Sequence, residues 1–277
     1  MAGTAVVATG CGGQSPVDVP GLARSVRALV ETGWDAVLVP SLVPSGSDVA
    51  GPLTLALGQS RSGRRAVPVV THLLVDPADP ALAYPEAGAF PEPLAVLEAE
   101  AIAALVESGF TVVVAGQTPV VPNGSAPSFG GVPQSARGAG GVPQSEYRPV
   151  GVALDEAASA RRLAGDLGAP VLVFVAGDDS PLLADGPGVG ELDVIEAERR
   201  LTGDPRYAAE LRAAVRFLRA GGELAVITTP ALLPVALDDS APPPSASLNG
   251  GGTRVLRVRR KLVRPRSEAP ALAAGWC

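Results

Sequence analysis

Lysine is almost absent from this sequence. Only Lys261 is a lysine among the 277 residues, and it lies in a basic C-terminal tail, residues 254–277. The tail holds seven basic residues and one acid, so the remaining chain carries 15 arginines against 27 acids, a net charge of about −12. Such an acidic body excludes a nucleic-acid or acidic-membrane surface there. The tail is suited to contact an acidic surface.

Histidine and cysteine are also scarce. The one histidine is His72, and the two cysteines, Cys11 and Cys277, lie at opposite ends of the chain. These counts exclude a disulfide framework and a metal site made of several histidines. The sequence also lacks an apolar run of about 18 residues and an N-terminal leader with a basic start and an apolar core. We therefore expect a cytoplasmic protein with no metal and no cofactor.

Short apolar runs alternate with longer helical stretches along the chain. Because the runs are apolar throughout, they are typical of parallel strands that are covered on both faces. Strands that alternate with helices predict an α/β fold with a mainly parallel central sheet. The predicted strands are Ala5–Ala8, Ala36–Val39, Val67–Val75, Thr111–Ala115, Val171–Val175 and Leu224–Thr228.

Helical spacing predicts three longer helices. The first covers 19–30 and ends before Gly33, and the second covers 94–105 and ends before Gly109. The third begins at Asp204-Pro205, a cap followed by a first-turn proline, and runs to about 220. The apolar positions behind the first two predictions are Val19, Leu22, Val26, Leu29, Val30, Leu94, Leu97, Ala101 and Leu105.

Two segments lack an apolar period. Residues 122–149 contain GGVPQS twice, and we interpret them as a mobile loop rather than a binding repeat. Residues 240–252 read as a flexible connection. The basic tail that follows is either a strand that pairs with a sheet edge or a disordered arm.

A glycine-rich turn, ATGCGGQS at residues 8–15, follows the first apolar run. Gly10, Gly12 and Gly13 suit a loop whose backbone N–H groups face an anion at a helix N-terminus. A tight strand-to-helix turn is the alternative. Cys11 gains thiolate character in the first case and is a small buried thiol in the second.

Several longer segments follow one another as they do in carbamate kinases. "VVTHLLVDPADPALAYP" resembles the mid-chain segment of that family, and "VLEAEAIAALVESGFTVVVAGQTPVV" resembles the helix, strand and glycine-rich loop that come next. "AAVRFLRAGGELAVIT" and "GTRV" resemble its C-terminal helix, strand and end. The resemblance covers roughly residues 4–255. It implies the amino-acid-kinase fold, a three-layer αβα sandwich that is usually a homodimer.

This resemblance also implies an organisation of the chain. A carbamate-kinase-like domain covers 1–253, with a small-molecule half at about 1–150 and a nucleotide half at about 151–253, and the tail covers 254–277. Gly10, Gly12 and Gly13 match the glycine turn that holds the small acid. Further substrate contacts are expected from Gln14, Ser41 and Gln117.

Acids stand where the family carries phosphate-neutralising lysines. Glu156 takes the place of a lysine between two aspartates, and Glu210 takes the place of a nucleotide-contacting lysine. Ala176 replaces an aspartate, and "VPSLVPSGS" and "YPEAGAFPEP" lack the histidine and the lysine expected there. Because phosphoryl transfer depends on positioning and electrostatics, these changes predict its loss. The arginines that offer partial compensation are Arg24, Arg27 and Arg206.

Asp155, Glu156, Asp178 and Asp179 form two acidic pairs near the former nucleotide region. They suit a metal ion or a cationic amine. The alternative is a set of exposed acids at helix N-termini, where the helix dipole favours negative charge.

Three side chains are candidates for catalysis: His72, Cys11 and Thr118. His72 suits a general acid or base, or it is a hydrogen-bonded histidine at a strand edge. We expect an ATP-independent enzyme that acts on a small amine- or carboxylate-bearing metabolite in specialised metabolism. The alternatives are a non-catalytic binding or scaffold pseudokinase and an atypical kinase of a small acid.

Overall fold

The computed structural model describes residues 3–11, 18–40, 49–58, 64–83, 90–123, 146–176, 191–203, 208–237 and 254–257. Several predictions lie outside these residues: Gly12, Gly13, Gln14, Ser41, Asp178, Asp179, Asp204, Arg206, most of the loop 122–149, the connection 240–252 and the tail beyond 257.

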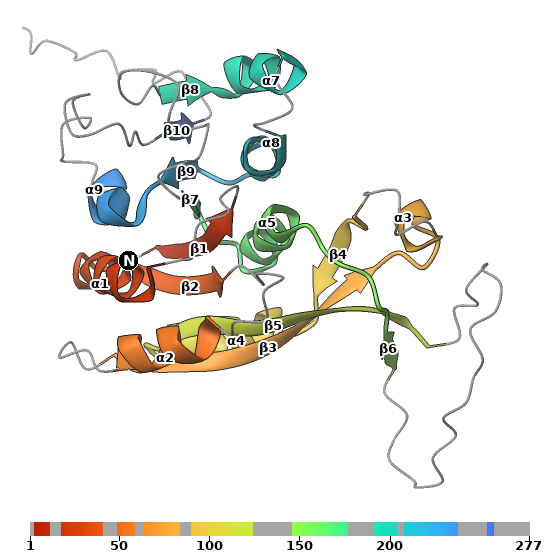
Figure 1. Ribbon diagram of the computed structural model, residues 1–277, viewed down its shortest axis with the longest axis horizontal. Helices are drawn as coiled ribbons and strands as arrows, with labels where there is room; N and C mark the ends of the chain where they lie inside the picture. The colour runs from red at the N-terminus through yellow and green to blue at the C-terminus, as the bar shows by residue number, and fades with distance from the viewer. Residues whose placement is uncertain are drawn as a thin grey trace, which may run out of the picture.

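The described strands form one ten-stranded sheet (Figure 1). They are β1 (Thr4–Cys11), β2 (Asp35–Pro40), β3 (Ala66–Val75), β4 (Pro93–Val96), β5 (Thr111–Pro122), β6 (Tyr147–Pro149), β7 (Val171–Ala176), β8 (Glu191–Asp193), β9 (Leu224–Thr228) and β10 (Arg254–Arg257). Their order is β4-β3-β5-β2-β1-β7-β9-β10-β8, and β6 pairs with β5. Every neighbouring pair from β3 to β9 in this order is parallel. The six predicted strands are therefore confirmed.

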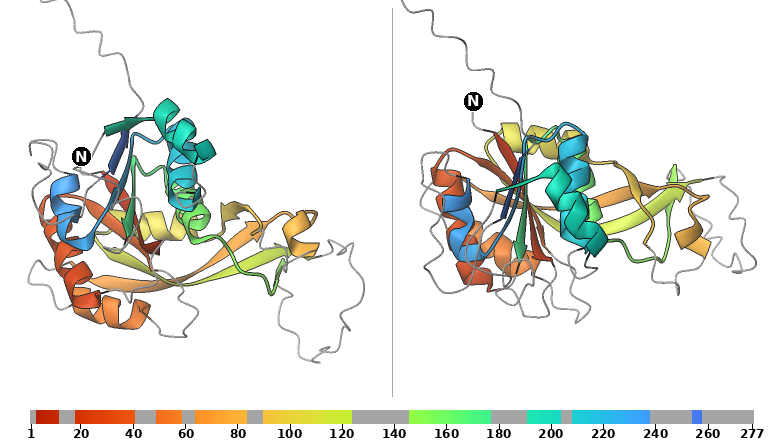
Figure 2. Two further views of the ribbon diagram at one scale, coloured as in Figure 1. Left: turned by 45° about the horizontal axis from the view of Figure 1, so that its top comes forward. Right: turned by 90° about the horizontal axis from the view of Figure 1, so that it is seen from above.

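Helices cover both faces of the sheet (Figure 2). On one face lie α1 (Val19–Glu31), α2 (Ala50–Gly58) and α9 (Leu233–Ala236), which follows the short helix η3 (Pro230–Leu232). On the other lie α4 (Ala99–Glu107), α5 (Glu156–Asp166), α7 (Val194–Gly203) and α8 (Ala208–Arg219). Each layer packs its own apolar cluster against the sheet. This arrangement confirms the predicted three-layer α/β fold.

The ends of the helices follow local rules. Asp18 caps α1 by accepting a hydrogen bond from the Gly21 N–H at 3.1 Å. Gly33 and Gly109 follow α1 and α4 with φ of 99° and 83°, a left-handed backbone that favours glycine. Both glycines were predicted as helix ends, and both are confirmed.

The predicted helix over 94–105 is wrong in its start and in its buried face. Leu94 lies on β4, and α4 begins at Ala99. The buried positions of α4 are Ile102 and Val106, whereas Leu94 is 47% exposed. Leucines at 94, 97 and 105 mimic a helical stripe because a short strand and a turn place apolar residues at similar spacing.

The outer halves of β3 and β5 project beyond the body of the sheet together with β4, β6 and α3 (Pro80–Ala83), and we call this part the extension (Figure 1). Strand β5 pairs with β2 only at Val112 and Val113, but it pairs with β3 as far as Val120. Asp166, the last residue of α5, accepts a hydrogen bond from the Val96 N–H at 2.7 Å. A carboxylate of the C-terminal half therefore holds the extension.

Residues 254–257 form β10, which pairs antiparallel with β9 and parallel with β8. For these four residues of the tail, the structure agrees with the strand alternative. Among the described helices, none combines the length and the apolar character that a membrane crossing requires.

The corrected buried face of α4 predicts a stability difference. Ile102→Ala should lower the free energy of unfolding by about 2–5 kcal/mol because it opens a cavity in the core. Leu94→Ala, the control from the wrongly predicted stripe, should cost less than about 1 kcal/mol because that side chain is half-exposed. Urea unfolding of both variants measures the difference, and equal losses would contradict the assignment.

Candidate functional site

The carboxyl ends of the central strands meet at one edge of the sheet. In open α/β sheets this edge is where ligands bind. Strand β1 lies between β2 and β7, and its Thr9 is in register with Pro40 and Val175. Gly10 and Cys11, the last residues of β1, follow directly, and Cys11 pairs with Ala176 of β7. The predicted glycine loop therefore starts at the edge where a ligand is expected.

Thr9 is a candidate that the sequence analysis missed. Its side chain is buried, at 1% exposure, and its hydroxyl Oγ1 makes no hydrogen bond to any described residue. A buried polar group without a partner costs about 1–3 kcal/mol, so such groups call for an explanation. A polar atom of a bound ligand would satisfy this hydroxyl. The signal in the sequence is a threonine that ends an apolar strand just before the first glycine.

His72 forms a pair with Glu98. Its Nδ1 lies 2.6 Å from Glu98 Oε1, and its backbone N–H donates to Glu98 Oε2 at 2.7 Å. The imidazole is 44% exposed. The carboxylate orients the ring through Nδ1 and leaves Nε2 for another partner. Strand β4 is in register with β3 only from Leu73 to Val75, so His72 lies just before this paired stretch. Its bond to Glu98 agrees with the hydrogen-bonded histidine of the alternative interpretation.

The structure brings His72 and Thr118 together, because they are register partners on adjacent strands. Gln117 is likewise the partner of Thr71, whose hydroxyl donates to the Gly116 carbonyl at 3.2 Å. These residues lie in the extension. Strand β2 separates β5 from β1, and therefore from Cys11, by two strand spacings of about 5 Å each. The three catalytic candidates thus fall into two groups.

Two of the former nucleotide residues lie at the start of α5, and a third lies in α8. Asp155 caps α5 by accepting a hydrogen bond from the Ala158 N–H at 2.7 Å, so the helix-cap alternative describes it. Glu156 opens the helix. Glu210 is buried at 6% exposure in α8. Desolvation, followed by the nearby charges of Asp155 and Glu156, raises the pKa of Glu210 above its usual range.

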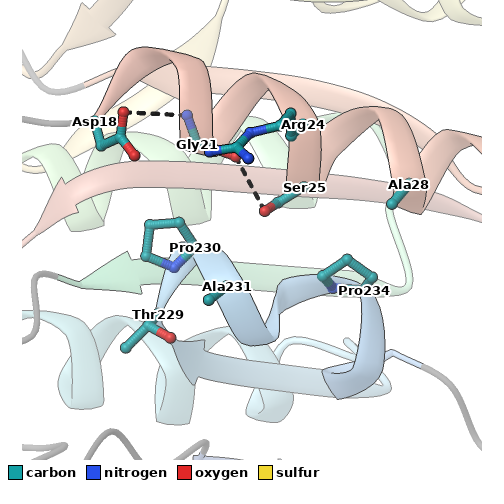
Figure 3. Close-up of a pocket in the computed structure, with 9 residues that line it drawn as sticks. All are labelled: Asp18, Gly21, Arg24, Ser25, Ala28, Thr229, Pro230, Ala231 and Pro234. Atoms are coloured by element: carbon teal, nitrogen blue, oxygen red, sulfur yellow. Dashed lines mark hydrogen bonds between the residues drawn. The ribbon is translucent and has the colours of Figure 1, made fainter.

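Two of the arginines expected to compensate for missing lysines lie on the other layer. Arg24 and Arg27 belong to α1, whereas Glu210 lies on α8, which covers the opposite face of the sheet. Arg24 lines a cavity of about 440 Å³ between α1 and the η3–α9 segment, and its Nε donates to the Pro20 carbonyl at 3.4 Å (Figure 3). The expected compensation by these two arginines is therefore not observed.

A second cavity, of about 310 Å³, lies between α5 and α8 beside residues 90–92. Arg161, Arg212 and Arg216 line it together with Glu92 and Asp155. The sequence analysis did not identify these arginines. For Arg212 and Arg216 the sequence did carry a signal, because their four-residue spacing places both on one side of α8.

Within the described part of the chain, no three histidine, cysteine, aspartate or glutamate side chains are grouped so that they could hold a metal ion.

Known proteins are similar to this chain in sequence, although no family model matches it. The carbamate kinase-like protein YahI of Escherichia coli is 29% identical over 220 residues, which are 63% of each chain. Carbamate kinase of Halobacterium salinarum is 30% identical over 54% of this chain and 46% of its own. The chain is thus similar in sequence to carbamate kinases. The matched part spans less than two thirds of either relative.

Solved structures support the same fold. Carbamate kinase of Giardia lamblia with AMP-PNP bound superposes with a TM-score of 0.67 over 92% of this chain and 99% of that one. The two sequences are 16% identical, so this likeness concerns the fold. The predicted amino-acid-kinase fold is thereby confirmed, and this carbamate-kinase-like chain has the corresponding three layers.

The buried carboxylate of Glu210 predicts a pH-dependent effect on stability. A raised folded-state pKa gives stability that is present at acidic pH and lost as the pH rises through that pKa. Glu210→Gln should therefore raise the melting temperature at neutral pH and lose this advantage below the usual glutamate range. Glu107→Gln, at the exposed end of α4, is the control. A melting temperature lowered by Glu210→Gln at neutral pH would contradict the assignment.

Proposed function

We propose that this carbamate-kinase-like protein has lost ATP-dependent phosphoryl transfer and acts on a small amine- or carboxylate-bearing metabolite. The binding site would lie at the carboxyl edge of the central strands, around Thr9 and the glycine loop that starts at Gly10. The proposal makes the protein an ATP-independent enzyme of specialised metabolism.

The environment of Glu210 is the observation that carries the proposal. In the family resemblance, Glu156 and Glu210 stand where lysines neutralise phosphate. Asp155 and Glu156 lie close enough to Glu210 to add to the rise of its pKa that burial causes, so three acids are grouped at this position. Two like charges at about 4 Å repel by about 4 kcal/mol at a surface-like dielectric. A triphosphate would meet repulsion where a kinase needs attraction.

The small-molecule site would draw on residues from two places. Thr9 offers an unpartnered hydroxyl at the end of β1, and Cys11 follows on the same strand. Gly12, Gly13, Gln14 and Ser41 remain candidates for contacts with the metabolite. In the extension, the His72–Glu98 pair would serve as general base or acid, with Thr118 and Gln117 beside it.

A homodimer is part of the proposal. Leu55 of α2 is 71% exposed and Val70 of β3 is 54% exposed, and the two elements pack against each other. Exposed apolar side chains on adjoining elements are typical of interaction surfaces. The same surface also suits a heterologous partner, which is the arrangement expected of a non-catalytic scaffold.

Mg-ATP is the decisive ligand. We expect no change in melting temperature of the full chain with Mg-ATP, because Glu156 and Glu210 repel its phosphates. The Glu156→Lys/Glu210→Lys variant should gain a shift, since it restores the charges of the family pattern. A nucleotide at 100 times its Kd would add about 2.7 kcal/mol to the free energy of unfolding. A clear shift in the melting temperature of the unmodified protein with Mg-ATP would contradict the proposal and favour a kinase.

Thr9→Val tests the small-molecule site. Because valine removes an unpartnered buried hydroxyl and keeps the shape, the free energy of unfolding should stay equal or rise by up to about 1 kcal/mol. The same variant should lose the melting-temperature shift that any active compound in a panel of small amines and carboxylates gives with the unmodified protein. Thr54→Val on α2 is the control, because its hydroxyl bonds only within its own helix. An undiminished shift in Thr9→Val would remove Thr9 from the site.

A further inference from the structure

The cavity between α5 and α8 shares no lining residue with β1. Both helices cover the same face of the sheet and lie side by side (Figures 1 and 2). Residues 90–92, at the start of the extension, close one side of the cavity. Its lining combines three arginines and two acids with apolar groups: Phe90, Pro91, Glu92, Asp155, Ala158, Arg161, Ala209, Arg212, Ala213 and Arg216. We call this cavity the arginine groove.

A carboxylate of the chain itself already lies between two of the arginines. Arg161 donates from its terminal Nη2 to Glu92 Oε1 at 2.6 Å, and Arg216 donates from Nη1 to Glu92 Oε2. Both oxygens of one carboxylate are thus used, one by each helix. Glu92 is 45% exposed, so this carboxylate is accessible to solvent. The groove thus already holds one anionic group at this point.

The arginines retain hydrogen-bonding capacity that Glu92 does not use. Arg161 Nε is buried and has no partner among the described residues. Desolvation and the neighbouring Arg216 and Arg162 lower the pKa of Arg161, and Glu92 and Asp166 offset this only in part. Arg212 makes no ion pair within the described ranges. The Asp155 carboxylate, at the other end of the groove, is engaged as the cap of α5.

These features match a phosphate group better than a carboxylate. A guanidinium group offers paired donors whose geometry fits phosphate oxygens. A phosphate monoester carries up to two charges and three terminal oxygens, enough for three arginines, whereas Glu92 satisfies two. The volume of about 310 Å³ is at the lower end for small-molecule sites. Phe90 and Pro91 provide an apolar wall for the group that carries the phosphate.

We propose that the arginine groove binds the phosphate group of a small phosphorylated metabolite, with Arg161, Arg212 and Arg216 as its ligands, in place of the Glu92 carboxylate. Phosphate binding then releases residues 90–92 from α5 and α8. The proposal does not depend on the fate of phosphoryl transfer, because its three arginine ligands are not among the residues assigned around Thr9 and Glu210. Asp155, which also raises the pKa of Glu210, lines the groove but is not one of these ligands.

Titration calorimetry of the full chain with phenyl phosphate and with inorganic phosphate tests this site. No metal ion is added. Glu92→Gln removes the competing charge and keeps the shape, so it should tighten phenyl phosphate binding about fivefold. The Arg212→Gln/Arg216→Gln variant should weaken it by at least about tenfold, because charge-assisted hydrogen bonds are lost. Tighter binding of phenyl phosphate than of inorganic phosphate would support an ester as ligand, and the reverse order would overturn that part.

Arg219→Gln controls for the lost positive charge. Arg219 lies on the same helix but pairs with Glu198 at 2.5 Å and does not line the groove. Affinity for phenyl phosphate should therefore change little in this variant. Equal weakening by Arg219→Gln and by the double variant would overturn the site, as would no binding at millimolar concentration to the unmodified chain or to Glu92→Gln. Mg-ATP could also raise the melting temperature of the unmodified protein and still raise it in Arg212→Gln/Arg216→Gln. This result would contradict the proposed loss of phosphoryl transfer, but it would not contradict the proposal for the arginine groove.

Discussion

Burial of the central parallel strands on both faces is the constraint on which the structure depends. Strands β2 and β7 are buried almost throughout, and β1 between them is buried from Ala5 to Thr9. Only backbone hydrogen bonds and apolar side chains are suited to such positions. Polar chemistry is therefore confined to strand ends, to the extension and to the helical layers. Thr9, a buried hydroxyl near the end of β1, is one of these polar groups at strand ends.

Charge is organised by the same constraint. In the described parts of α5 and α8 every basic group is an arginine, and carboxylates from other elements reach these helices: Glu92 meets Arg161 and Arg216, and the Asp166 carboxylate of α5 holds β4. Arginine binds two partners at fixed angles and keeps its charge. The acidic body thus holds its outlying extension by directed ion pairs, while Glu210 forms no ion pair with another of the residues that the structure describes.

Much of the fold followed from the sequence, because continuous apolar runs and helix-capping residues are local signals. Asp18, Gly33 and Gly109 act at the helix ends as their types predict. The start of α4 did not follow, since the leucines at 94 and 97 belong to a strand and a turn whose pairing with β3 is a long-range contact. Pattern reasoning does not register such pairing.

The candidate site was predicted less well. His72 was identified, but its partner Glu98 lies 26 positions away and is brought to it by the pairing of β3 with β4. The arginine groove joins residues from three separate segments, so spacing within one helix gave no warning of Arg161 or Glu92. The compensating role expected of Arg24 and Arg27 failed because the sequence does not state which face of the sheet a helix covers.

Strand β10 has a consequence for how the molecule is assembled as it is synthesised. In the described sheet β8 pairs with β10, which in turn pairs with β9. A ribosome releases β8 and α7 well before residues 254–257, and domains begin to fold during synthesis. Until β10 arrives, β8 lacks the one strand that it pairs with in the described sheet, and the edge of β9 stays open. Closure of this end of the sheet is thus a late event, because it waits for a strand that follows β8 and β9 in the chain.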